Sequence, residues 1–291
     1  MTYSTHNPRS YTLRVTCPAA TGLVSMITSH LAESGCYISE LSQYDDEETK
    51  RFFMRCVFLA PADNLPAGNL LGESFSAAAK ARSMDWAVRS NAKPYRVLLM
   101  VSKFDHCLRD LLYRWEKGEL PMDVVGIASN HEAMASVAQR YGIPYHHIPV
   151  TAQTKPAAEQ ALRSLVAELK VDLVVLARYM QILSDELSRD LAGHCINIHH
   201  SFLPSFKGGS PYTQAHQRGV KLVGATAHYV TGDLDEGPII EQDVRRIDHR
   251  YAPAEIVSLG RDIEAVVLAR ALKLHLEDRV FIDGNKTIVF D

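Results

Sequence analysis

The sequence predicts an α/β protein in two parts: a small part with the element order βαββαβ, and a larger part built on a doubly wound, mostly parallel sheet. Near the N-terminus, short segments alternate apolar and polar residues as half-buried strands do, and two others repeat apolar residues at helical spacing. After residue 95 the strand-like segments become continuously apolar, which indicates a parallel sheet covered by helices on both faces. The polar, proline-containing stretch at 90–94 separates the two patterns and predicts domains at residues 1–90 and 91–291.

The first part is expected to fold as a four-stranded sheet with two helices. The periodicities predict, in order, a strand at 11–17, a helix at 22–34, strands at 36–41 and 52–58, a helix at 69–81 and a strand at 85–89. A charged turn at 45–48 is expected between the second strand and the third. This order is the split βαβ pattern of ferredoxin-like domains.

The second part alternates apolar strands with helical patterns. Strands are expected at 96–101, 123–128, 147–150, 172–177 and 195–198, and then, after a change of rhythm, at 224–230 and 238–244. A helix is expected to start near Pro211, and a long helix at 254–276 to be interrupted at Gly260. A tight turn at 283–285 predicts a terminal hairpin. In such open sheets, ligands bind beyond the carboxyl ends of the strands.

Composition favours small-molecule chemistry over binding to nucleic acids or membranes. The 291 residues include 31 basic and 34 acidic ones, and no block of like charge stands out, so neither nucleic acid nor an anionic membrane is an expected partner. The N-terminus has no apolar leader, and no apolar run is long enough to span a membrane, so we expect a cytoplasmic protein.

The cysteines and histidines do not form a recognisable metal or disulfide pattern. The five cysteines are odd in number and widely spaced, which favours reduced core thiols over a disulfide framework or a zinc site. The thirteen histidines include no HExxH spacing. We therefore expect neither a metal nor a separate cofactor.

Polar side chains at the end of the strand at 195–198 are the first candidates for chemistry. Asn197 and His199 lie on the same face of the strand, because side chains alternate, and Asp235 lies in a loop that Gly237 and Pro238 close. A carboxylate near His199 would stabilise the imidazolium form, and with the amide this set suits an oxyanion on a carbonyl under attack. Singly, each residue also has an ordinary explanation as a turn former, a core histidine or a loop cap.

Three motifs in order resemble the formyltransferase family that uses 10-formyltetrahydrofolate. They are NIHHSFLPSFKG at 197–208, GATAHYV at 224–230 and LDEGPII at 234–240, and the resemblance runs from about Tyr95 to the C-terminus. It implies a formyltransferase-fold catalytic domain in which Asn197, His199 and Asp235 are the catalytic residues.

The same resemblance implies a folate substrate and a set of residues that contact it. The pterin is expected against the segment RYMQIL at 178–183 and the loop around Asp233. The substrate-binding residues implied are Arg178, Met180, Ile182, His228 and Asp233. From the sequence alone, Met180 and Ile182 could equally pack the start of a helix, and His228 could be a satisfied histidine of a strand.

The first part is similar to an ACT domain, a small module that senses ligands and dimerises. The resemblance implies a regulatory or oligomerisation role for residues 1–90 and a homo-oligomer as the expected assembly. The loop CPAATGLV at 17–24 lacks the Asp that such domains usually offer to an amino-acid ligand. We therefore expect assembly alone, or a different effector.

The loop after the first strand of the second part bears on the formyl acceptor. In the glycinamide ribonucleotide transformylase branch of the family a glycine-rich loop there cradles the acceptor phosphate. This chain has VSKFDHCL at 101–108, without glycine, and resembles the deformylase branch, which implies hydrolysis to tetrahydrofolate and formate. Transfer to an amine, and a regulatory protein that binds folate without turnover, stay open as alternatives. A nicotinamide-dependent dehydrogenase is disfavoured, because no GxGxxG follows the first strand of either part.

Overall fold

The computed structural model describes residues 9–61, 71–203 and 211–291, and the chain divides into two compact units. The first unit ends at Pro94 and also takes in the last two residues, and the second spans Tyr95–Val289. Helices and strands alternate as expected, and the sheet of the second unit is mostly parallel. In the part of the chain that is described, none of the helices combines the length and the apolar character that a membrane span requires.

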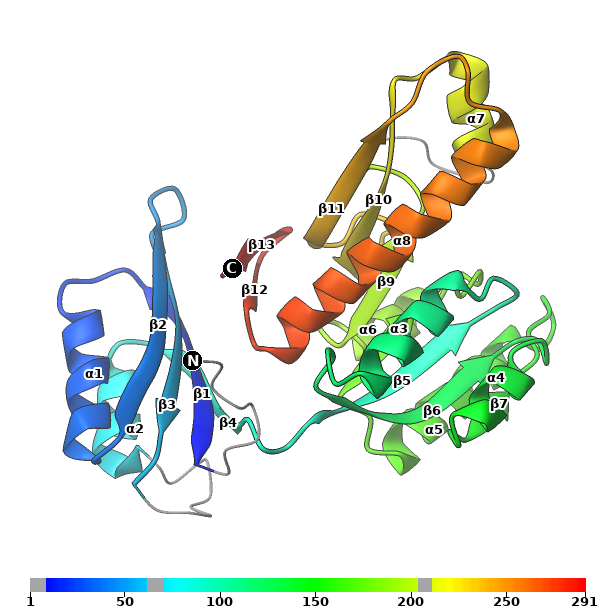
Figure 1. Ribbon diagram of the computed structural model, residues 1–291. Coiled ribbons are helices and arrows are strands. Elements are labelled where there is room, and N and C mark those ends of the chain that lie inside the picture. The colour runs from blue at the N-terminus through cyan, green and yellow to red at the C-terminus, as the bar shows by residue number, and fades with distance from the viewer. Residues whose placement is uncertain (1–8, 62–70, 204–210) are drawn as a thin grey trace. The chain divides into compact units, whose positions relative to one another are not determined.

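The first unit is a four-stranded antiparallel sheet with both helices on one face (Figure 1). Its elements are β1 (Ser10–Pro18), α1 (Leu23–Glu33), β2 (Tyr37–Asp46), β3 (Arg51–Leu59), α2 (Gly72–Ala81) and β4 (Asp85–Ser90). The strand order is β2-β3-β1-β4. Alternate residues of β1 and β3, such as Leu13 and Met54, pack against Ile27 of α1 and Phe75 of α2.

One boundary in this unit differs from the expectation, and another lies outside the described residues. The turn expected at 45–48 begins later, because β2 continues to Asp46. Asp46 Oδ1 then accepts hydrogen bonds from the backbone N–H groups of Glu48 and Thr49, at 2.9 and 3.1 Å, which is the usual way an Asp starts a turn. The start of the helix expected at 69 lies outside the described residues.

The second unit is built on a seven-stranded sheet in the order β11-β10-β9-β8-β5-β6-β7. The strands are β5 (Tyr95–Val101), β6 (Met122–Ser129), β7 (Tyr145–His147), β8 (Leu173–Leu176), β9 (Cys195–His199), β10 (Leu222–Tyr229) and β11 (Ile239–Arg246). The strands from β9 to β7 are parallel, whereas β10 pairs antiparallel with both β9 and β11. The expected terminal hairpin is β12 (Val280–Asp283) and β13 (Lys286–Val289).

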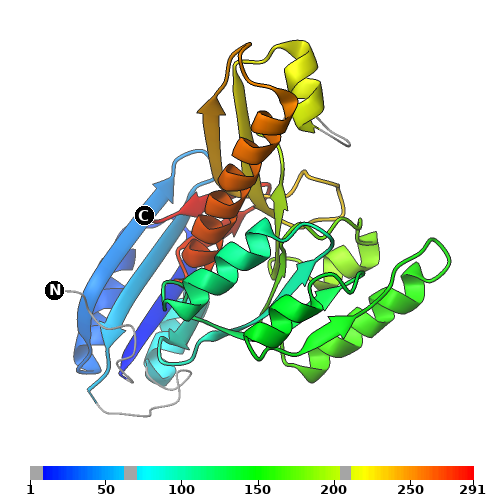
Figure 2. The same ribbon diagram turned by 45° about the vertical axis from the view of Figure 1, so that its right-hand side comes forward.

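Helices cover both faces of this sheet (Figures 1 and 2). They are α3 (His106–Glu116), α4 (Ala135–Arg140), α5 (Lys155–Glu168), α6 (Asp185–Asp190), α7 (Pro211–Arg218) and α8 (Pro253–Leu276). Strand residues such as Leu99 and Val175 pack with α3, α4 and α8 on one face, and their neighbours Leu98 and Val174 pack with α5 and α6 on the other. Burial on both faces explains why these strands are continuously apolar in the sequence.

The bounds of the strand expected at 147–150 were wrong: β7 is Tyr145–His147, so it begins two residues and ends three residues earlier. Ile148 still donates its N–H to the carbonyl of Ser129 at 2.8 Å. The next residue, Pro149, has no N–H to continue the ladder, so pairing stops there.

The interruption expected at Gly260 was also wrong, because α8 runs unbroken through this glycine. A Cβ at position 260 would lie 2.1 Å from Cζ of Tyr212, whose ring packs there from α7. The glycine is therefore explained by the close approach of a second helix. The hydroxyl of Tyr212 is held by Glu264 at 2.7 Å, so the ring has little freedom to move away.

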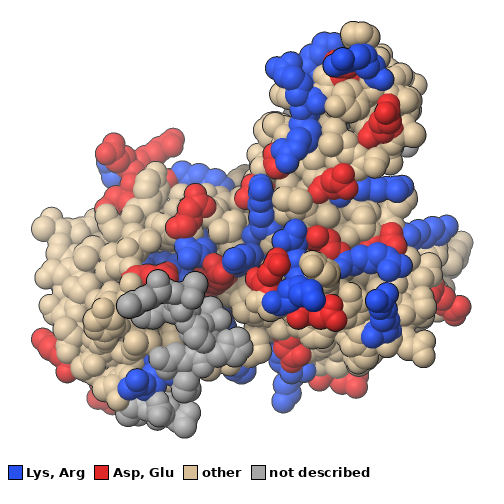
Figure 3. Space-filling model, in the orientation of Figure 1, with Lys and Arg blue, Asp and Glu red and all other residues tan. Residues whose placement is uncertain are grey.

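The face of the second unit that is visible in Figure 3 carries interspersed acidic and basic side chains. Many are paired: Arg114, for example, bonds both Asp110 at 2.7 Å and Glu119 at 3.1 Å. A surface of alternating sign differs from the continuous basic stripe that nucleic-acid binding requires.

Gly260→Ala should lower the free energy of unfolding by about 1–3 kcal/mol, because the added methyl overpacks the contact with Tyr212. Without that contact, alanine inside a helix would stabilise by roughly 0.5–1 kcal/mol. Denaturant unfolding of the single variants and of Gly260→Ala/Tyr212→Ala checks this, since the glycine change should cost less once the ring is absent. Equal costs in both backgrounds would contradict the packing explanation.

Candidate active site

A pocket of 390 Å³ lies where β8 and β9 end, beside the segment that joins β10 to β11. Its lining comes from residues in three stretches of chain, 176–188, 197–200 and 228–235. This is the edge of the sheet at which ligands of open α/β folds bind. The pairing of β10 with β9 sets His228 directly opposite Asn197, so two of the stretches meet through the sheet register.

Asn197, His199 and Asp235, far apart in the sequence, all line this pocket. Asp235 Oδ2 lies 3.1 Å from Nδ1 of His199, and its Oδ1 lies 3.6 Å from Nε2 of His228. His199 and His228 are both buried, at 5% and 2% exposed, so solvent does little to screen these contacts. Asp235 thus faces two imidazoles, one from each of two adjacent strands.

The charge of Asp235 is stabilised by these two rings. Burial by itself would raise the pKa of the Asp235 carboxyl, but hydrogen bonds with His199 and His228 outweigh burial and hold the pKa well below its usual value. The carboxylate therefore stays ionised at neutral and mildly acidic pH. Asp235 also adopts a left-handed backbone conformation, with φ of 57°, which is unusual outside glycine and is common at functional sites.

A serine that the sequence analysis missed holds the other side of His199. Ser201 Oγ lies 2.7 Å from Nε2 of His199, and the carbonyl of Ser201 accepts a hydrogen bond from the hydroxyl of Thr226 at 3.0 Å. Both nitrogens of His199 are therefore engaged, which fixes the plane of its ring. The signal was present in the NIHHS motif, because Ser201 is two residues beyond His199 along the chain.

The amide of Asn197 keeps one hydrogen for a ligand. His228 Nδ1 lies 2.9 Å from the carbonyl oxygen of Tyr229, so that nitrogen carries a proton and, in the neutral ring, Nε2 accepts. The amide nitrogen of Asn197 lies 3.3 Å from Nε2 and supplies one of its two hydrogens. The second hydrogen is available to a group in the pocket that Asn197 lines.

The segment at 178–183 lines the pocket without helical structure, and a hydrogen bond to Ser102 connects it to the sheet. The hydroxyl of Ser102, the residue after β5, donates to Asn130 Oδ1 at 2.6 Å and accepts from the N–H of Met180 at 3.0 Å. Met180 and Ile182 line the pocket and are 49% and 60% exposed, so they are not core residues of a helix start. The next helix, α6, begins only at Asp185.

The remaining residues expected at the substrate, Arg178 and Asp233, also line the pocket. Arg178 is buried, has a φ of 67°, and places its guanidinium 5.3 Å from the ring centre of Phe104. Its Nε lies 3.3 Å from Glu264 Oε2, an ion pair without hydrogen-bond alignment. Asp233 is exposed, and its carbonyl accepts from the hydroxyl of Thr231 at 3.1 Å.

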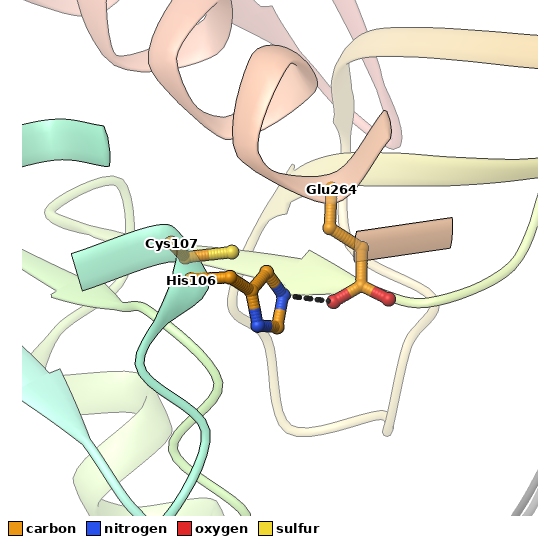
Figure 4. A group of neighbouring side chains, drawn as sticks. All are labelled: His106, Cys107 and Glu264. Carbon is orange, nitrogen blue, oxygen red and sulfur yellow. Dashed lines mark hydrogen bonds and ion pairs between the residues drawn. The ribbon is translucent and has the colours of Figure 1, made fainter. Parts of the chain in front are cut away.

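Glu264 of α8 is the centre of a second buried polar cluster, in which His106 points to its carboxylate (Figure 4). Arg178 lies close to the same carboxylate. His106 Nε2 lies 2.8 Å from Oε2 of Glu264, and the hydroxyl of Tyr212 donates to Oε1 at 2.7 Å. Burial would raise the pKa of Glu264, but His106, Arg178 and Tyr212 together lower it. No local pattern in the sequence indicates this cluster, because its members come from three helices and the loop after β8.

His106, Cys107 and Glu264 bring donor atoms within 4.8 Å of one another, as a metal site would. The surroundings do not suit a cation. Burial raises the pKa of the Cys107 thiol well above its usual value, so the thiol stays protonated. Both oxygens of Glu264 already face donors, and one of these is the cationic Arg178. The cluster is therefore best described as a network of ion pairs and hydrogen bonds around Glu264.

Known proteins similar to this chain are formyl transferases and formyltetrahydrofolate deformylases. The family model described as formyl transferase matches residues 95–272. Formyltetrahydrofolate deformylases of Corynebacterium sp. (strain P-1) and Bacillus subtilis are 50% and 44% identical, each over 96% of this chain and over 97% and 93% of their own lengths. The crystal structure of a formyltetrahydrofolate deformylase from Burkholderia mallei matches with a TM-score of 0.92 at 50% identity, over 98% of this chain and 100% of that one.

A more distant structural relative matches only part of the chain. Glycinamide ribonucleotide transformylase 1 from Symbiobacterium toebii has a TM-score of 0.65 at 28% identity, over 68% of this chain and 95% of that one. The deformylases thus match nearly the whole chain, whereas this transformylase matches about two thirds of it.

Gly237→Ala should displace the Asp235 loop and lower the free energy of unfolding by about 1–3 kcal/mol. A Cβ at position 237 would lie 1.8 Å from the carbonyl oxygen of Tyr229, so the loop cannot keep its path. A crystal structure of the variant should show Asp235 more than about 4 Å from His199, beyond ion-pair distance. Gly232→Ala is the matched control, since a Cβ there meets nothing within 4 Å. An unmoved Asp235 in Gly237→Ala would refute this reasoning.

Proposed function

Because the chain belongs to the formyltetrahydrofolate deformylase branch of the formyl transferase family, we propose that Asn197, His199 and Asp235 carry out the hydrolysis of 10-formyltetrahydrofolate to tetrahydrofolate and formate. The observation that carries the proposal is the meeting of these three side chains in one pocket, with the carboxylate 3.1 Å from the imidazole. An amide donor, an acid and its counter-charge are the parts that acyl transfer to water requires.

The pocket suits the folate in size and chemistry. Its volume of 390 Å³ lies within the usual range of about 300–1,000 Å³ for small-molecule sites. Met180 and Ile182 supply exposed apolar surface for the flat pterin, and Arg178 and Asp233 supply charged groups in the lining of the same pocket. His228 acts through its contacts with Asn197 and Asp235. The folate is the substrate in this proposal, and no further cofactor takes part.

Each catalytic side chain has a separate role. The free N–H of Asn197 donates to the oxygen of the formyl group as it becomes an oxyanion. His199, in its imidazolium form, gives a proton to N10 as the C–N bond breaks. Asp235 stabilises that imidazolium, and its two oxygens already face His199 and His228, so it is not placed to take a proton from the attacking water. The proton of the water therefore needs another acceptor.

The segment at 101–108 favours water over a phosphorylated acceptor. Asp105 precedes the first turn of α3, where a phosphate would otherwise bind to free backbone N–H groups. Its pKa is lowered by a hydrogen bond from Arg109, so the carboxylate is ionised and repels an anion. Phe104 beside it is 41% exposed and occupies the approach.

Purified protein incubated with 10-formyltetrahydrofolate in buffer should release tetrahydrofolate and formate in equal amounts. Asn197→Ala should lower kcat by about 10²–10³, because one oxyanion donor is lost. His199→Ala and Asp235→Ala should lower kcat by orders of magnitude, while His194→Ala, an exposed histidine before β9, should match the wild type.

Three results would redirect the proposal. Near-normal turnover in Asn197→Ala would refute the assigned roles. Formyl transfer to an added amine that outpaces formate release would indicate a transferase. Tight folate binding without turnover, with or without an amine, would indicate a regulatory protein.

We further propose that residues 1–90 form an assembly and regulatory module, that residues 91–291 form the catalytic domain, and that the protein is a homo-oligomer. Strand β2 lies at the edge of its sheet, where backbone groups are open to pairing, and exposes Tyr37 and Tyr44, at 62% and 43%. Tyr37→Lys/Tyr44→Lys should shift sedimentation equilibrium towards the monomer. An unchanged mass would argue against this edge as the interface.

A further inference from the structure

We propose that His200 is a catalytic residue that orients the attacking water and accepts its proton. This inference rests on the hydrolysis proposed above and concerns the step for which Asp235 is unsuited. His200 directly follows the end of β9, and its side chain lines the same pocket as Asn197, His199 and Asp235.

The ring of His200 is held by packing, which leaves its nitrogens for a ligand. It meets the ring of His199 edge to face, with centroids 5.1 Å apart and planes at 79°. On another side it meets Tyr212 at 6.2 Å and 86°. Among the described residues, none takes a hydrogen bond from the imidazole of His200 or gives one to it. An imidazole that is held in place by two ring contacts, and whose nitrogens bond no other group, can bind a water molecule.

The other bases near Asn197 are already engaged. His199 is the acid of the proposed mechanism, and as an imidazolium paired with Asp235 it has no lone pair for a proton of the water. His228 is 2% exposed, with Tyr229 on one nitrogen and Asn197 on the other. Recruiting either ring as the base would break the contacts that place the oxyanion donor and the acid. His200 can act without disturbing them.

Four charged or titratable groups shift the pKa of His200: His199 on β9, Arg178 after β8, Asp235 after β10 and Glu264 on α8. A fifth titratable group, Tyr212 on α7, meets its ring edge to face. Burial, Arg178 and His199 lower the pKa of His200 to about 4, against the opposing effects of Glu264 and Asp235. Because this pKa is lowered, the ring is neutral above pH of about 4 and keeps a lone pair for the water. Only protonation of the ring, at a pH below this pKa, would occupy that lone pair.

The proton and bond changes balance across two steps. As the water oxygen bonds to the formyl carbon, one water proton passes to His200, and the carbonyl pair moves to the oxygen that Asn197 stabilises. The oxyanion then re-forms the carbonyl, and the C–N10 bond breaks. N10 takes the bonding pair together with a proton from the imidazolium of His199. Formic acid ionises, one proton restores His199, and His200 releases its proton to solvent.

The test replaces His200 with Phe, which keeps both edge-to-face contacts but has no lone pair. Formate release should fall by about 10²-fold or more, the usual contribution of a general base. His200→Gln, whose amide oxygen accepts a hydrogen bond, should recover part of the loss. His216→Phe makes the same change at an exposed histidine of α7 and should leave turnover unaffected.

Hydroxylamine separates a role in water activation from a structural one, because this nucleophile attacks carbonyls without a base. His200→Phe should form the formyl hydroxamate at close to the wild-type rate, whereas Asn197→Ala should lose both reactions. Binding of a non-hydrolysable 10-formyl folate analogue should be unchanged in His200→Phe.

Equal losses with water and hydroxylamine, or undiminished hydrolysis in His200→Phe, would overturn the role of His200 and leave the deformylase proposal intact. Absence of formate release from the wild-type protein would instead overturn the proposed function, and this inference with it.

Discussion

One carboxylate organises the site of the second unit. Asp235 faces imidazoles on two adjacent strands, and each imidazole is fixed at its other nitrogen by a group of its own. Because the charge is half-buried, solvent cannot replace these partners, and the loop that carries Asp235 must stay where the two strands put it. The orientation of Asn197 follows from the same arrangement, since its amide is held by one of the two rings.

A second buried carboxylate, Glu264, holds together the elements around the site, as Asp235 holds together the residues proposed to react. Glu264 draws together the start of α3, the turn after β8 and the first turn of α7 through His106, Arg178 and Tyr212. Tyr212 and His106 hydrogen-bond the carboxylate, and the guanidinium of Arg178 adds an ion pair, so the buried negative charge is compensated. Tyr212 in turn reaches Glu264 only because residue 260 has no side chain. The wall behind His200 is thus held by charge pairing and by close packing together.

Much of this fold was predictable, because the spacing of apolar residues along the sequence indicates which face of each helix or strand is buried. The order of elements and the mostly parallel sheet were expected from it and are confirmed. The errors arose where long-range contacts decide. The end of β7 depends on a missing N–H at Pro149, and the continuity of α8 at Gly260 depends on a ring from another helix. Of the site, the residues within motifs could be named, whereas Glu264 and Tyr212 come from helices without a local signature, and His200 had no pattern to distinguish it from its neighbour.

The segment between β10 and β11 is fixed at both ends as well as in its middle. The N–H of Tyr229 donates to the carbonyl of Pro238 at 3.0 Å, and Gly237 lies against the Tyr229 carbonyl so closely that no side chain fits. Between these points Asp235 must still reach His199. An insertion or deletion here would therefore move the carboxylate even if every residue of the motif were retained. Over evolutionary time this segment should tolerate changes of side chain at Leu234 and Glu236, which are exposed, far better than any change of length.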